Sequence, residues 1–131
     1  MTLVLDTSIL IDIEHNNKKT IDILKQLRAE HQDIPHIALI NHFEFLIGLK
    51  EKKPHNEARG LHFLELFPVL AANKLTSKHL ADLKYKYDKK GLLIPLADFL
   101  IAAQVIENNM TFVTRDKDYE GIEEMDKIIL T

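Results

Sequence analysis

The sequence predicts an α/β domain in which helices cover both faces of a short parallel sheet. Short apolar runs have the length of buried strands, and they lie at residues 2–5, 37–40, 69–70, 111–114 and 127–130. Longer segments with apolar residues at helical spacing alternate with them. With 131 residues and 46% hydrophobic content, the chain is expected to fold as a single domain over residues 1–131.

The first half of the chain contains three predicted helices. One begins at Ile9, behind a cap at residues 7–8. Thr20 precedes a second helix, whose apolar residues recur at helical spacing. Asn41 follows the second strand and is the expected N-cap of a helix over residues 43–50.

The second half contains three more predicted helices. Pro68 ends the first of them, and the second opens at Thr76 and closes at Gly91. The third covers residues 94–106 and is apolar on nearly all sides, as expected for a buried helix, but it contains Asp98. An ionised carboxylate in such surroundings needs a basic partner, backbone donors or a metal ion.

Four acidic residues are expected at one edge of the predicted sheet. Asp6 follows the first strand directly, Glu44 lies in the first turn of the helix after the second strand, and Asp116 comes two residues after the strand at 111–114. The carboxyl ends of parallel strands meet at one edge of a sheet. Asp98 joins the other three if the N-terminal end of its helix points to the same edge.

Each acid also has a structural explanation. Asp6 is a suitable N-cap, and Glu44 has the capping-box spacing to Asn41. Asp98 suits the first turn of a helix, where the helix dipole favours an acid, and Asp116 suits a turn.

A metal site explains all four acids together. Independent helix caps have no reason to gather at one edge of a sheet, whereas a metal site requires its ligands to gather. Converging carboxylates repel one another unless a cation lies between them, and oxygen ligands suit Mg²⁺ or Mn²⁺. The natural chemistry of such a site is phosphodiester hydrolysis.

Composition excludes several classes of protein. The chain contains no cysteine, which excludes a disulfide framework and thiolate zinc sites and fits a reducing compartment. No apolar run is long enough to span a bilayer, and Asp6 comes too early for a signal peptide. A soluble, cytoplasmic protein without a membrane partner is therefore expected. The net charge of −3 is not that of a protein that holds nucleic acid by a broad basic surface.

Four segments surround the acids: LVLDTS at 3–8, EFLIG at 44–48, DFLIAA at 98–103 and VTRDKDY at 113–119. They resemble the motif blocks of PIN-domain ribonucleases, and in particular VapC-type toxins of prokaryotic toxin–antitoxin operons. The resemblance implies a three-layer α/β/α sandwich that cleaves RNA. It also implies a homodimer and inhibition by an antitoxin whose helix docks beside the active site.

Carried over by position, the resemblance makes Asp6, Glu44, Asp98 and Asp116 the catalytic acids and the ligands of Mg²⁺ or Mn²⁺.

Further residues have auxiliary roles under this resemblance. Thr7 and Thr114 would be hydroxyls that orient carboxylates or water. Arg115 could clamp a substrate phosphate or be a surface residue of a turn. Asp118 could be an extra ligand or a solvated turn acid. The sequence departs from the usual pattern at Tyr119, where Phe is common, and at Asn41, where Ser or Thr is frequent; both changes are expected to affect packing or substrate fit.

Two other functions fit the same residues. A phosphoacceptor signalling domain also places acids at the strand ends of a parallel sheet. It normally has paired acids near the N-terminus and a lysine on a late strand, and residues 111–113 contain no lysine. A non-catalytic RNA-binding module on the same fold would retain RNA without cleaving it and would tolerate loss of Asp116.

Overall fold

The apolar runs near the two ends of the chain pair into one parallel sheet. The computed structural model describes residues 2–30 and 33–131. Strand β1 (Leu3–Leu5) pairs with β2 (Thr111–Thr114), and β2 pairs with β3 (Lys127–Ile129). The strand order β1-β2-β3 places in the centre a strand from late in the sequence.

The sheet extends beyond β1 by two isolated bridges. Val4 is bridged to His36, and Ile37 to Val69, both in parallel orientation. The expected strands at 37–40 and 69–70 are therefore reduced to one bridging position each. The predicted parallel orientation is confirmed for all the paired segments that the structure describes.

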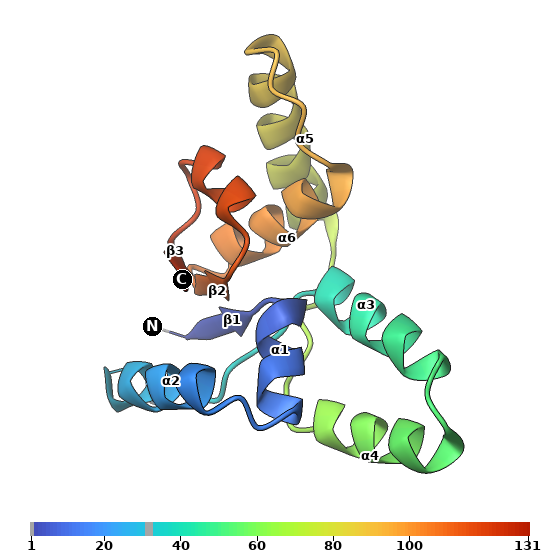
Figure 1. Ribbon diagram of the computed structural model, residues 1–131. Helices are drawn as coiled ribbons and strands as arrows, with labels where there is room; N and C mark the ends of the chain where they lie inside the picture. Colours follow the sequence, from blue (N-terminus) through green and yellow to red (C-terminus); the bar gives the residue numbers. More distant parts are fainter. Residues whose placement is uncertain (1, 31–32) are drawn as a thin grey trace.

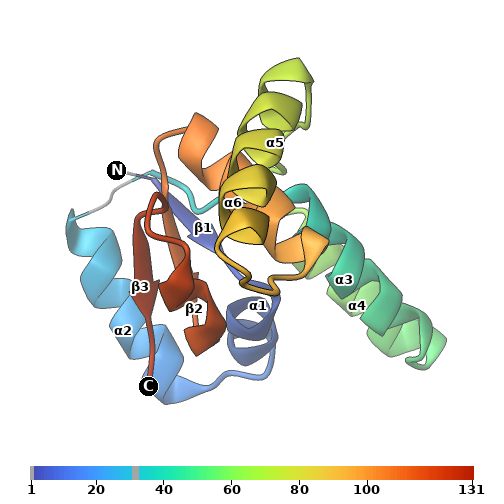
Figure 2. The same ribbon diagram turned by 90° about the horizontal axis from the view of Figure 1, so that it is seen from above.

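Helices cover the sheet on both sides (Figure 1; Figure 2). They are α1 (Thr7–Glu14), α2 (Lys18–Glu30), α3 (Leu39–Lys50), α4 (Pro54–Leu64), α5 (Lys74–Lys89) and α6 (Leu96–Glu107), with a 3₁₀ helix η1 (Lys117–Gly121) before β3. None of the helices in the described ranges has the combination of length and apolarity needed to cross a membrane.

Two hydrophobic cores lie on opposite faces of the sheet. Val4 and Phe112 point into the core formed with α5 and α6, whereas Leu3 and Leu5 point into the core formed with α1 to α4. All four side chains are almost completely buried, and each contributes about 1.5–3 kcal/mol to folding. Because successive strand residues face opposite sides, apolar residues at every strand position predict coverage of both faces. The three-layer α/β/α sandwich is confirmed.

Helix α3 begins earlier than the sequence predicts. Its first residue is Leu39 and its N-cap is Ala38, so the expected cap at Asn41 is wrong. The orphan backbone N–H groups at this end have other acceptors: Gln104 Oε1 accepts from Leu39 N at 3.0 Å, and Asn41 Oδ1 accepts from Ala38 N at 3.3 Å. As a result Glu44 lies in the second turn of the helix and not in the first.

Helix α5 also begins earlier than expected. Asn73 is its N-cap and accepts hydrogen bonds from Leu75 N and Thr76 N, while Thr76 Oγ1 accepts from Asn73 N in return. Thr76 is thus the third residue of the helix. The predicted end is confirmed, because Gly91 follows the helix with φ of 74°, a conformation that favours glycine.

Candidate functional site

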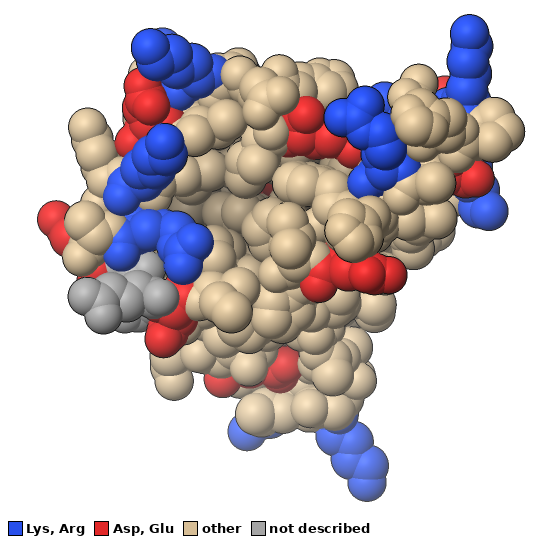
Figure 3. All heavy atoms as spheres, turned by 90° about the horizontal axis from the view of Figure 1, so that it is seen from below, with Lys and Arg blue, Asp and Glu red and all other residues tan. Residues whose placement is uncertain are grey.

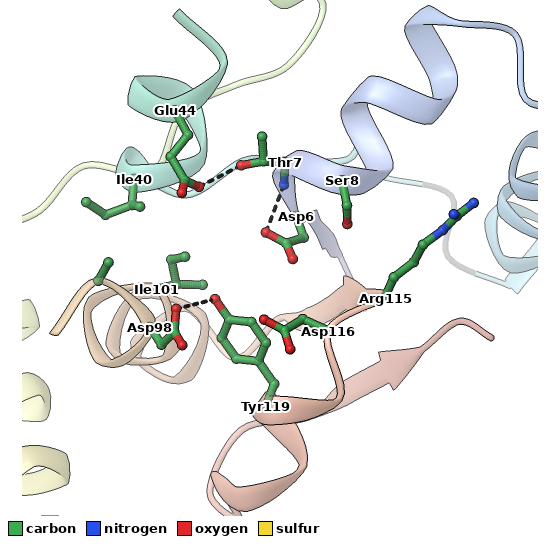
Figure 4. A pocket seen from close by; sticks show the side chains of 11 residues that line it. Asp6, Thr7, Ser8, Ile40, Glu44, Asp98, Ile101, Arg115, Asp116 and Tyr119 are labelled. Carbon is green, nitrogen blue, oxygen red and sulfur yellow. Dashed lines mark hydrogen bonds between the residues drawn. The ribbon is translucent and has the colours of Figure 1, made fainter. Parts of the chain in front are cut away.

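The four acids expected at one edge of the sheet line a single pocket of about 360 Å³ (Figure 4). They come from the end of β1, from α3, from the first turn of α6 and from the loop after β2. The remaining lining residues are Thr7, Ser8, Ile40, Ala97, Ile101, Arg115 and Tyr119. The expectation that the N-terminal end of the Asp98 helix points to this edge is confirmed.

Asp6 is at once a helix cap and the most enclosed of the four acids. Its Oδ1 accepts hydrogen bonds from the Thr7 backbone N–H at 2.8 Å and from Asn41 Nδ2 at 3.0 Å. Thr114 Oγ1 donates to Asp6 Oδ2 at 2.5 Å. Because Asp6 is the N-cap, α1 begins at Thr7 and not at Ile9. The capping explanation is correct for this residue, and it does not remove Asp6 from the pocket.

Glu44 is held from the opposite wall by Thr7. The Thr7 hydroxyl donates to Glu44 Oε1 at 2.8 Å and accepts from Asn41 Nδ2 at 3.3 Å. Glu44 does not form the capping box that its spacing suggested, because the helix starts before Asn41. Asn41 is fully buried and links Asp6 to Thr7, a role that the sequence analysis missed. Its position, one turn before Glu44 on the same helix, was the available signal.

Asp98 accepts a hydrogen bond from Tyr119, a residue that the sequence marked only as a departure from the family pattern. The Tyr119 hydroxyl donates to Asp98 Oδ1 at 3.0 Å (Figure 4). Burial and the neighbouring carboxylates raise the pKa of Tyr119, so the hydroxyl keeps its proton and acts as a donor. Tyr119 follows Asp116 by three residues, a spacing that puts both on one side of a helical turn.

Asp116 joins the pocket through the cap of η1. Its Oδ1 accepts from Asp118 N at 2.9 Å, and its own N–H donates to Thr114 Oγ1 at 3.0 Å. The Thr114 hydroxyl therefore contacts both Asp6 and the backbone of Asp116, as expected of a residue that orients carboxylates. Asp118 is exposed and is not among the residues that line the pocket, which favours its interpretation as a solvated turn acid.

The acids act on one another electrostatically. Burial is the main cause that raises the pKa of Asp6; hydrogen bonds from Thr114 and Thr7 oppose it, and the charges of Glu44 and Asp116 add to it. Burial likewise raises the pKa of Asp98, against the hydrogen bond from Tyr119 and together with nearby acidic charges. The ionised pocket is therefore an unfavourable concentration of negative charge that a bound cation would relieve.

Comparison with known protein families identifies the chain. The family described as "PIN domain" matches residues 3–126. The chain belongs to the PIN domain family. A comparison with curated proteins gave no significant match.

Solved structures share the fold of this PIN domain. A chain of VapBC2 from Rickettsia felis, bound to a DNA fragment from its promoter, superposes with a TM-score of 0.86 at 24% identity, covering 100% of both chains. VapBC-1 from nontypeable Haemophilus influenzae gives 0.79 at 22% identity over 98% of both chains. VapBC-5 from Mycobacterium tuberculosis, a member of the VapBC family of toxin–antitoxin systems, gives 0.69 at 19% identity over 99% of this chain and 100% of that chain.

Arg115 of the PIN domain points away from the carboxylates, toward α1 and α2 (Figure 4). Its guanidinium forms an ion pair with Asp12 and donates to Thr20 Oγ1 at 2.8 Å. Thr20 Oγ1 in turn donates to Asp12 Oδ2 at 2.6 Å. These contacts tie the loop after β2 to both helices. They favour a structural role for Arg115 over the phosphate clamp considered from the sequence.

Replacing Arg115 with alanine is expected to lower the free energy of unfolding by about 1 to 2 kcal/mol, because the half-buried Asp12 loses its charged partner. Asp12→Asn should cost a similar amount, and the double variant should cost little more than either single one. Thermal melting of the three variants measures this coupling. A phosphate clamp would instead show as weaker substrate binding in Arg115→Ala with an unchanged melting temperature.

The donor set of this PIN domain fits a small, hard divalent cation. Carboxylate oxygens are the ligands that Mg²⁺ and Mn²⁺ prefer. In residues 2–30 and 33–131, no three His, Asp or Glu side chains are close enough together to form a ready-made metal cage. Mg²⁺ does not need such a cage, since it keeps several waters and is usually held by only one or two carboxylates. An open pocket walled by four acids is compatible with this mode of binding.

Proposed function

We propose that this PIN domain is a Mg²⁺- or Mn²⁺-dependent endoribonuclease and the toxin of a VapBC-type toxin–antitoxin module. The observation that carries the proposal is the convergence of Asp6, Glu44, Asp98 and Asp116 on one pocket. These four side chains would hold the cation. When bound, the cation would supply an activated water and stabilise the charge that develops on the scissile phosphate.

The other residues of the pocket orient the acids. The Thr114 hydroxyl holds one oxygen of Asp6, and Asn41 with the Thr7 N–H holds the other. Thr7 also fixes Glu44 across the pocket. Such outer contacts limit the rotation of the carboxylates, so less freedom is lost when a cation and a phosphate bind.

Side-chain charge alone does not supply a strong site for a polyanion. In Figure 3, Lys and Arg form separate groups toward the margins of the face shown, with acidic and uncharged surface between them. Of the described residues that line the pocket, Arg115 is the cation, and it is paired with Asp12. A divalent ion among the acids would provide the positive charge that an RNA phosphate needs there.

The phosphoacceptor alternative is less well supported. The described lining of the pocket contains no lysine, whereas such a domain normally has a lysine on a late strand.

A groove beside the pocket supports an antitoxin as partner. It lies between α1 and α3 and shares Thr7 and Glu44 with the acid pocket. Its lining includes the apolar Ile11, Phe45 and Leu49 beside the polar Glu14, His15 and Lys52. Gly48 lies on this groove, and a Cβ placed there would meet no atom within 4 Å. The space beside Gly48 is thus not filled by another described part of the chain. An antitoxin helix in this groove would lie against Glu44 and block the acids.

The toxin proposal also includes action in the cytoplasm and a homodimer, as in the resemblance on which it draws. The related solved chains come from VapBC systems. Under this proposal, a gene for a short antitoxin should lie next to the gene for this chain.

The decisive experiment is cleavage of RNA by the purified chain with Mn²⁺ and with excess EDTA. We expect products with Mn²⁺ and none after chelation, because the proposed reaction needs a cation to activate the attacking water and to offset the negative charge of the acids. Retention of RNA without products in Mn²⁺ would favour the non-catalytic RNA-binding module. Activity that persists in EDTA would contradict the metal-dependent mechanism.

A further inference from the structure

Tyr119 makes a contact that the proposed function does not require. Its hydroxyl lies 3.0 Å from Asp98 Oδ1, inside the pocket that the four acids line. Figure 4 shows the ring between Asp98 and Asp116, with the hydroxyl directed at Asp98. The hydrogen bond engages one of the two oxygens of this carboxylate.

The tyrosine is a rigid donor. Its side chain is 3% exposed, and its ring packs edge-on against Phe112, with centroids 4.9 Å apart and an interplanar angle of 61°. Ile122 N donates to the Tyr119 carbonyl at 3.1 Å, which holds the backbone at the end of η1. A phenylalanine would fill the same space against Phe112 but could not hold the Asp98 oxygen.

The number of carboxylate oxygens that can bind one ion affects which cation the carboxylate prefers. Ca²⁺ takes six to eight oxygens at about 2.3–2.6 Å and often binds a carboxylate through both oxygens. Mg²⁺ is smaller and requires a nearly octahedral arrangement at about 2.0–2.1 Å. A carboxylate oxygen that accepts a hydrogen bond keeps a second lone pair, so Asp6 can still bind an ion. A fixed donor on one oxygen nevertheless opposes binding of a single ion through both oxygens, the mode that Ca²⁺ often uses.

We propose that the Tyr119 hydroxyl restricts Asp98 to binding a divalent cation through one oxygen and thereby makes the site select Mg²⁺ and Mn²⁺ over Ca²⁺. Tyr119 is a positioning residue in this proposal, since it acts through Asp98. The inference rests on the proposed metal site and assigns the selectivity of that site to a residue outside the four acids.

The test compares cation affinities of the wild type and Tyr119→Phe at one fixed pH. Mn²⁺ binding is measured by the EPR signal of the free ion, and Mg²⁺ and Ca²⁺ by competition with Mn²⁺. In Tyr119→Phe we expect the ratio of Ca²⁺ affinity to Mg²⁺ affinity to rise about tenfold, the lower end of what a lost outer-shell contact costs a metal site. The melting temperature in EDTA verifies that the variant is folded.

Tyr87→Phe is the matched control. The Tyr87 hydroxyl also donates to a carboxylate, Glu124 Oε1 at 2.6 Å, and its side chain is 1% exposed, but it does not line the pocket. Its removal should leave the ratio unchanged. An equal ratio in the wild type and Tyr119→Phe, with or without a common loss of affinity, would overturn the selectivity proposal alone. A wild type that binds no Mn²⁺ would overturn the proposed function as well.

A second measurement does not depend on the variant. In crystals of the wild-type chain soaked with Mn²⁺, Asp98 should contact the ion through one oxygen while the other stays bonded to Tyr119. Coordination through both oxygens would overturn the proposal.

Discussion

Replacing Asp98 with asparagine is expected to reduce RNA cleavage in Mn²⁺ by at least about 10²-fold, the loss that accompanies removal of one preorganised electrostatic contact in an active site. The fold should persist, because the asparagine amide oxygen can still accept the hydrogen bond from Tyr119. The substitution also removes a carboxylate whose charged form is disfavoured by burial, as its raised pKa indicates. Initial cleavage rates at saturating Mn²⁺, together with melting curves, measure both effects.

Asp118→Asn is the matched control for this substitution. It removes the same charge from an exposed residue that does not line the pocket, two positions from Asp116. Its cleavage rate should stay within a few-fold of the wild type. Equal losses in the two variants would indicate a general effect of charge, and full activity in Asp98→Asn would refute the role of the acid cluster.

The second large effect concerns stability. The folded protein raises the pKa of Asp6 and of Asp98, so it binds protons more strongly at these groups than the unfolded chain does. Their contribution to stability is fully present below the ordinary aspartate pKa of 3.8 and is lost as the pH rises through the raised values. At neutral pH the metal-free protein is therefore weakened by its own pocket.

Mn²⁺ should reverse this weakening at neutral pH. At about 100 times its dissociation constant, a ligand adds about 2.7 kcal/mol, or about 10 °C in melting temperature for a domain of this size. Near pH 4 the increment should shrink, because protonated carboxylates do not hold the ion. Scanning calorimetry at both pH values measures the increase in melting temperature caused by Mn²⁺, with NaCl of equal ionic strength as the control. A melting temperature unaffected by millimolar Mn²⁺ at neutral pH would be incompatible with a shared site.

Much of this arrangement could be predicted from the sequence, for identifiable reasons. Asp6 follows the apolar strand β1 directly, and Asp116 comes two residues after the buried strand β2. Parallel pairing brings the ends of such strands together whatever the helices do. Asp98 could be recognised because a lone charge in an apolar helix requires a partner. The same pattern predicted the two-sided burial of Val4 and Leu5.

The start of α3 and the role of Tyr119 could not be predicted. The helix begins at Leu39 because Gln104, from a distant helix, accepts its N–H, and no local pattern reports such a contact. The Tyr119 hydroxyl reaches Asp98 only through the packing of its ring on Phe112. In both cases the deciding hydrogen bond joins two different elements of the fold, and propensity and periodicity within one segment do not report such a contact.

The position of β2 in the centre of the sheet governs when the acidic pocket can form during synthesis. A nascent chain that has reached the end of α5 carries Asp6 and Glu44, but it lacks the strand that pairs with β1 and the Thr114 hydroxyl that holds Asp6. Pairing β1 with β2 joins segments that are far apart in sequence, and such non-local contacts form slowly during folding. A ribosome-bound fragment that ends at α5 therefore has no assembled acidic pocket. Under the proposed function, a cell making the protein is not exposed to nuclease activity until the last third of the chain has emerged and docked.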